Sequence, residues 1–138
     1  MTASTATRVL RRIDELARCS SDPDALTRIF LSPQHRAANE LVSGWMKAAG
    51  MQTRIDAIGN VIGRYEGNAP ALPCLMLGSH LDTVRNAGKY DGMLGVVAAI
   101  ECVDALHGAG VRLPFALEVI GFADEEDRKS TRLNSSHG

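Results

Sequence analysis

The fold is decided by the stretch LMLGSHLDTV, residues 75–84. Its apolar start, residues 75–77, predicts a short strand buried on both faces, because a strand inside a parallel sheet need not alternate. Residues 78–79 end the strand, so His80 falls just past its carboxyl end, where open α/β sheets place their ligands. We expect His80 to bind a metal ion and the Asp82 carboxylate to hold its other ring nitrogen.

Composition indicates one modest domain and excludes several function classes. The chain has 138 residues, and 45% of them are hydrophobic, which is enough for a real core. A formal net charge of -1 and an aromatic content of 4% give no reason to expect nucleic acid or a membrane surface as a partner. Three scattered cysteines and an N-terminus without a continuous apolar run favour reduced thiols and no signal peptide. We therefore expect a cytoplasmic protein.

Upstream of the opening stretch, the pattern predicts two helices and a pair of strands. Apolar residues at helical spacing mark a first helix over residues 7–18, whose arginines we expect to form a solvated face. A serine N-cap and a proline in the first turn open a second helix over residues 32–50, and a glycine ends it. We interpret His35 in this helix as a surface residue without a role. Residues 51–58 and 61–65 predict a hairpin-like strand pair.

Downstream, a long helix and a second buried strand complete a βαβ unit. Residues 92–109 are nearly all apolar, and we expect their one polar stripe, which includes Glu101, to be the edge that faces water. Residues 115–122 predict the next buried strand. The sequence therefore predicts an α/β fold, a three-layer sandwich with a mixed, mostly parallel sheet.

Three polar features fall at the same edge of this predicted sheet. His80 and Asp82 follow one strand, Asp91 opens the long helix, and Glu125 with Glu126 follows the next strand. Each has an ordinary structural alternative: Asp82 as a turn residue, Asp91 as a helix N-cap, and the glutamates as a solvated strand end. A βαβ unit brings the carboxyl ends of both strands to one edge, so we favour a metal site. Mixed histidine and carboxylate ligands suit zinc, manganese, cobalt or nickel better than calcium.

The motifs at this edge resemble those of a known superfamily. GSHLDT at residues 78–83, KYDGMLG at residues 89–95 and FADEE at residues 122–126 are together similar to the di-metal aminoacylase and dipeptidase superfamily. Within it, the chain most resembles the branch of allantoate amidohydrolases and N-carbamoyl-L-amino acid hydrolases. The sequence VRNAGKYDG at residues 84–92 is most similar to the corresponding motif of the allantoate enzymes. The resemblance covers residues 7–126.

The resemblance implies a role for each residue that matches these motifs. His80 would bind one of two divalent metal ions, Glu126 the other, and Asp91 would bridge them. Glu125 would be the general base toward the attacking water, and Asp82 would orient His80. The two ions would be zinc or manganese, with cobalt or nickel as further possibilities.

The resemblance also implies an activity and a partner. The expected reaction is metal-dependent hydrolysis of a ureido or amide C–N bond in a small-molecule substrate. For allantoate the products would be a ureidoglycine-type compound, ammonia and carbon dioxide. Members of the family carry two further histidine ligands and a dimerisation domain later in the chain, so the parent protein would be a homodimer through a domain that is absent here.

The end of the chain departs from the family pattern. Residues 127–138 have no apolar period and resemble a translated sequencing-adapter read-through, so we expect them to be a non-native, disordered tail. Residues 1–126 would then be the N-terminal part of a metal-dependent catalytic domain. Because the further histidines are missing, we expect weak metal affinity and no activity from this fragment.

Three other functions compete with allantoate hydrolysis. An N-carbamoyl-L-amino acid hydrolase, or an aminoacylase or peptidase of the same superfamily, would use the same site. A truncated domain without catalysis is a reading from a different class. A nucleotide-binding domain is disfavoured, because the glycines of residues 88–95 do not form a dinucleotide fingerprint.

Overall fold

A computed structural model describes residues 3–126 and shows three helices and four strands among them. In chain order these are α1 (Thr5–Ala17), α2 (Pro33–Ala48), β1 (Gln52–Ile55), β2 (Val61–Tyr65), β3 (Cys74–His80), α3 (Met93–Gly108) and β4 (Ala116–Phe122). Each element falls within or near the range that the sequence predicts. The expected N-cap of α2 is confirmed, since the Ser32 hydroxyl accepts a hydrogen bond from the His35 N–H at 3.1 Å. The predicted tail, residues 127–138, lies outside the described residues.

The strands form one sheet in the order β1-β2-β4-β3. Strands β3 and β4 are parallel and are joined through α3, so the predicted βαβ unit is present. Strands β1 and β2 are antiparallel, and so are β2 and β4. The expectation of a mixed sheet is confirmed, but the expectation of a mostly parallel one is wrong. A short turn can join β1 to β2 only as an antiparallel pair, and β2 then continues the antiparallel ladder onto β4.

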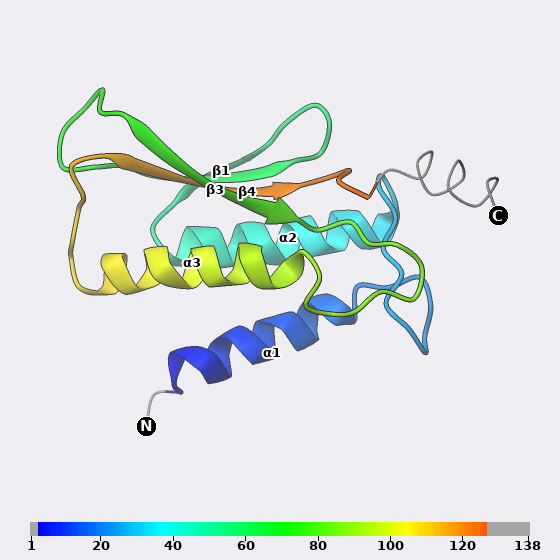
Figure 1. Ribbon diagram of the computed structural model, residues 1–138. Coiled ribbons are helices and arrows are strands. Elements are labelled where there is room, and N and C mark those ends of the chain that lie inside the picture. Colours follow the sequence, from blue (N-terminus) through cyan, green and yellow to red (C-terminus); the bar gives the residue numbers. More distant parts are fainter. Residues whose placement is uncertain (1–2, 127–138) are drawn as a thin grey trace, which may run out of the picture.

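Within the described residues, all three helices lie on the same side of the sheet (Figure 1). Helices α2 and α3 pack against the strands, and α1 packs against α3 on the side away from the sheet. The core lies between the strands and α2 and α3, with Val119 of β4 and Ile100 of α3 fully buried. For residues 3–126 the expectation of a three-layer sandwich is therefore wrong. In the same part of the chain, none of the helices combines the length and apolarity needed to cross a membrane.

Strand β3 is the edge of the sheet rather than its centre. Leu75 is 49% exposed and Met76 is 58% exposed, so the expectation that residues 75–77 are buried on both faces is wrong. The strand has a neighbour, β4, on one side only, and no helix of the described residues covers the far face of the sheet. An apolar strand at an edge can have the same composition as one in the middle of a parallel sheet. The apolar run of residues 75–77 therefore could not tell the two positions apart.

The polar stripe of α3 is also less exposed than its sequence suggests. Glu101 is 3% exposed, and its carboxylate forms ion pairs with Arg8 and Arg12 of α1. The expectations of a water-facing edge at Glu101 and of a solvated arginine face on α1 are both wrong for these residues. The packing of α1 on α3 covers them, and a buried carboxylate needs such partners to stay charged.

Arg28 joins the segment between α1 and α2 to the loop after β3. The residue is fully buried, and its guanidinium donates hydrogen bonds to the carbonyl oxygens of Leu16, Cys19 and Leu81 at 2.7 to 2.9 Å. Its backbone N–H also donates to the Thr83 hydroxyl at 2.8 Å. Burial lowers the pKa of Arg28 to about 10, so the side chain stays charged near neutral pH. This joint fixes the position of the loop that follows His80.

We predict that Arg28→Met lowers the free energy of unfolding by about 3 kcal/mol or more, because it leaves three buried carbonyl groups without a donor. The measurement is urea unfolding of the 138-residue chain followed by circular dichroism. Arg11→Met is the matched control on the exposed side of α1, and its expected effect is within about 0.5 kcal/mol. Equal effects of the two substitutions would contradict this assignment.

Candidate metal site

His80 is the last residue of β3, and the loop that follows the strand holds its imidazole ring. The Leu81 N–H donates to the Phe122 carbonyl at 3.0 Å and so extends the parallel ladder by one bond beyond His80. The His80 Nδ1 atom lies 2.8 Å from the backbone carbonyl oxygen of Asp82. A carbonyl can only accept, so Nδ1 carries the proton and Nε2 keeps its lone pair for a ligand. The backbone of Asp82 thus sets the tautomer of His80.

The Asp82 carboxylate has a different set of partners from the one the sequence suggested. Its Oδ1 atom is 3.5 Å from the His80 Nδ1 atom, which is longer than the contact of that nitrogen with the backbone carbonyl. Its two oxygens instead accept the backbone N–H groups of Glu125 at 3.1 Å and Glu126 at 2.9 Å. Asp82 is only 2% exposed, so these bonds are shielded from water. The carboxylate therefore ties the end of β4 to the loop after β3.

The N-terminus of α3 approaches His80 closely because Gly92 has no side chain. A Cβ atom there would lie 2.5 Å from the His80 carbonyl oxygen and 2.6 Å from its Cε1 atom. Gly92 also has a φ of 84°, a left-handed conformation that glycine adopts without strain. Gly92 is the N-cap and no side chain caps the helix, so Asp91 does not serve as the N-cap. Its carboxylate is 61% exposed and lies 3.4 Å from the His80 Nε2 atom.

The structure brings together the three residues that the sequence singled out as metal ligands. One ligand atom each from His80, Asp91 and Glu126 lies within 4.8 Å of the other two, and this is the one such group among residues 3–126. Glu125 is beside it, with Oε2 3.7 Å from the His80 Nε2 atom. One imidazole and two carboxylates form a donor set that fits zinc or manganese. These side chains come from three separate parts of the chain: the end of β3, the segment before α3 and the segment after β4.

The charges of the cluster favour a cation. Burial raises the pKa of Glu126, and the neighbouring charges of Glu125, Asp91 and Asp82 add to this against an opposing effect of His80. Burial lowers the pKa of His80, but the bond to the Asp82 carbonyl and three nearby carboxylates outweigh it and raise the pKa overall. Neighbouring carboxylates thus contribute to the raised pKa of both residues, after burial for Glu126 and after the bond to the Asp82 carbonyl for His80. A bound divalent cation would oppose this repulsion.

Sequence reasoning missed two supports of this site. Asn60, in the turn between β1 and β2, accepts the Ala123 N–H on its side-chain oxygen at 2.8 Å and so holds the chain just before the glutamates. Arg28 and Thr83 support the other side through the bonds described above. The one available signal was an arginine directly before the apolar residues 29–31, since a buried guanidinium needs several acceptors.

Comparisons with known proteins show which family the chain belongs to. The sequence pattern of peptidase family M28 matches residues 60–137, which is more than half of the chain. An N-carbamoyl-L-amino-acid amidohydrolase of a Pseudomonas species is 45% identical over 115 residues, which are 83% of this chain and 28% of that protein. Allantoate deiminase 1 of Glycine max is 44% identical over 117 residues, which are 83% of this chain and 24% of that protein.

A solved structure matches the fold as well. A hydantoinase/carbamoylase family amidase from Burkholderia ambifaria superposes with a TM-score of 0.82 at 33% identity, over 89% of this chain and 30% of that one. The chain thus spans less than a third of the length of these relatives. On the match to the family pattern and on these similarities, the chain belongs to peptidase family M28, in the branch of hydantoinases/carbamoylases and allantoate amidohydrolases.

Proposed function

We propose that this chain carries part of the catalytic centre of a metal-dependent amidohydrolase that cleaves a ureido or amide C–N bond in a small molecule. The observation that supports the proposal is the convergence of His80, Asp91 and Glu126, with Glu125 beside them. Relatives that are similar over the same region are named as an N-carbamoyl-L-amino-acid amidohydrolase and an allantoate deiminase.

Each residue at the site has a distinct task in this proposal. His80, Asp91 and Glu126 would hold divalent metal ions, and the resemblance to the family assigns Asp91 to both ions. The ions would polarise the carbonyl of the substrate and lower the pKa of water. Glu125 is 57% exposed on its side chain, so it can reach the attacking water, take its proton and return it to the leaving nitrogen. Asp82 keeps Glu125 and Glu126 in place.

Allantoate is the substrate we favour, with N-carbamoyl-L-amino acids as the alternative. The two relatives named above have nearly equal identity to this chain, 45% and 44%, and differ in their named substrate. The sequence of residues 84–92 resembles the motif of the allantoate enzymes, and this observation favours allantoate. We further propose that the parent protein is a homodimer and supplies more metal ligands than residues 3–126 contain.

We predict that the 138-residue chain binds zinc or manganese weakly, because three ligands leave the coordination of an ion incomplete. Glu126→Gln and Asp91→Asn should each lower the affinity about tenfold or more, since each removes a charged ligand. Isothermal titration calorimetry after treatment with a chelator measures this. Glu66→Gln is the control. It also removes one exposed carboxylate, but Glu66 follows the last residue of β2, at the end of the sheet away from His80. If all variants bind alike, no metal site exists here.

We predict that the parent enzyme releases ammonia from allantoate, and that Glu125→Gln slows the release about a hundredfold or more while metal binding persists. Asp124→Asn, the exposed neighbour, should change the rate little. The substrates to compare are allantoate, N-carbamoyl-L-amino acids and N-acyl-L-amino acids. The substrate with the highest kcat/KM identifies the preferred class.

The chain of 138 residues alone should show no turnover above the background with either metal. Robust hydrolysis by these residues alone would contradict the proposed need for further ligands. A parent enzyme that prefers N-acyl substrates would place it with the aminoacylases instead.

A further inference from the structure

The turn between β1 and β2 is organised by one carboxylate, that of Asp56. Its Oδ1 atom accepts three backbone N–H groups at 2.9 to 3.1 Å, those of Ile58, Gly59 and Asn60. Its Oδ2 atom accepts a fourth hydrogen bond, from the Asn60 side-chain nitrogen at 2.9 Å. The bond from the Asn60 side chain, together with the backbone bonds, holds the pKa of Asp56 below its ordinary value against an opposing effect of burial. The carboxylate is therefore charged near neutral pH.

The contact with Asp56 fixes which way the Asn60 amide points. A charged carboxylate can only accept hydrogen bonds, so Asn60 turns its NH₂ group toward Asp56. The Asn60 Oδ1 atom then faces away from Asp56, and it accepts the Ala123 N–H at 2.8 Å. Ala123 is fully buried, so water cannot easily replace this acceptor if it is lost. Asp56 therefore acts on the backbone at Ala123 through a single amide group.

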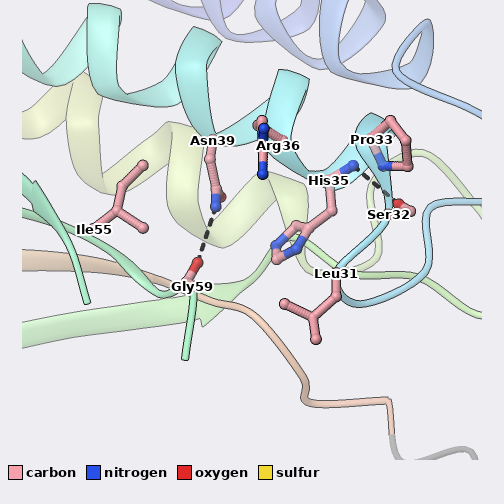
Figure 2. A pocket seen from close by; sticks show the side chains of 8 residues that line it. All are labelled: Leu31, Ser32, Pro33, His35, Arg36, Asn39, Ile55 and Gly59. Carbon is pink, nitrogen blue, oxygen red and sulfur yellow. Dashed lines mark hydrogen bonds between the residues drawn. The ribbon is translucent and has the colours of Figure 1, made fainter. Parts of the chain in front are cut away.

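The turn is itself anchored to α2, as Figure 2 shows. The Asn39 side-chain nitrogen donates to the Gly59 carbonyl at 2.9 Å, and Asn39 is buried. The His35 ring lies beside the turn, because a Cβ atom on Gly59 would be 4.0 Å from the His35 Cε1 atom. His35 is 2% exposed, so the expectation that it is a surface residue is wrong: the turn and Phe30 cover its ring. The turn is thus a fixed support against which Ala123 is held.

The segment after β4 is held at three backbone N–H groups. Asn60 accepts the N–H of Ala123. The Asp82 carboxylate accepts the N–H groups of Glu125 and Glu126. Two bonds to one carboxylate hold the segment at one place, and the bond to Asn60 adds a second place that sets the direction of the chain. A shift of Ala123 would therefore be carried to the two glutamates that follow it, and small displacements of catalytic groups are costly.

We infer that Asp56 is a positioning residue for Glu125 and Glu126. It acts through Asn60, whose amide it keeps in the one orientation that offers an oxygen to the Ala123 N–H. The importance of this for catalysis rests on the proposed function of the two glutamates. The arrangement of donors and acceptors from Asp56 to Ala123 does not depend on a metal ion, so it can be tested separately. Asp56 itself is not one of the residues of the metal cluster.

The test exchanges the two polar groups. In Asp56→Asn, the new amide keeps its oxygen toward the three backbone N–H groups and turns its NH₂ toward Asn60. Asn60 must then present its oxygen there and its own NH₂ to the Ala123 N–H, so two donors meet and the bond is lost. Adding Asn60→Asp supplies acceptors in both directions. The double variant Asp56→Asn/Asn60→Asp therefore restores the original order of donors and acceptors with the same net charge.

Nuclear magnetic resonance of the 138-residue chain in the presence of a chelator measures the effect. We expect the Ala123 amide to exchange its hydrogen about tenfold faster or more in Asp56→Asn, and to return to within about threefold in the double variant. The amide shifts of Glu125 and Glu126 should change and recover in the same way. Asp24→Asn, at an exposed position between α1 and α2, is the matched control and should change neither.

Zinc titration of the same variants separates this inference from the proposed function. We expect Asp56→Asn to lower the affinity about fivefold or more and the double variant to recover most of it. Ala123 exchange or glutamate shifts that stay unchanged in Asp56→Asn would overturn the inference. So would a double variant that fails to recover them, including the case in which Asp56→Asn does not fold. If the unaltered chain binds no zinc, the proposed function fails, while the metal-free measurements still decide whether Asp56 positions the segment.

Discussion

The candidate site depends on one buried carboxylate that connects two strand ends through backbone hydrogen bonds. Asp82 follows β3, and its two oxygens accept the N–H groups of Glu125 and Glu126, which follow β4. Hydrogen bonds to a charged group contribute about 1.5–3 kcal/mol each, and burial protects these two from competing water. The same residue, through its backbone carbonyl, sets the tautomer of His80. One aspartate thus positions the imidazole and both glutamates.

The rest of the fold keeps this connection in place from three sides. Gly92 lets the N-terminus of α3 come within contact of His80, and this brings Asp91 to the cluster. Arg28 holds the loop after β3 through hydrogen bonds to the Leu81 carbonyl and the Thr83 hydroxyl. Asn60 holds Ala123 on the β4 side. The supports from Arg28 and Asn60 are short hydrogen bonds at buried or partly buried positions, so they hold the backbone around the cluster without help from an ion.

The sequence predicted those parts of the structure that depend on local pattern and on the geometry of a βαβ unit. The apolar run of α3 and the strands on either side of it predicted His80, Asp91 and Glu126 at one edge of the sheet. In the structure, one ligand atom of each lies within 4.8 Å of the other two. The insertion of β2 between β1 and β4 could not be predicted, because the pairing partners are far apart in the chain. The exposure of Met76 and the burial of His35 could not be predicted either, because each depends on what packs nearby. The partners of Asp82 are backbone N–H groups, which every residue has, so they have no sequence signature.

The most direct test of the central claim is Asp82→Asn in the 138-residue chain, compared with the exposed Asp124→Asn. An asparagine places an NH₂ against one of the two backbone donors, so one bond is lost and the end of β4 is released. The account predicts large changes in the amide shifts of Glu125 and Glu126, together with a loss of zinc affinity of about tenfold or more, and neither for Asp124→Asn. Unchanged amide shifts and unchanged zinc affinity in Asp82→Asn would show that this carboxylate does not organise the site.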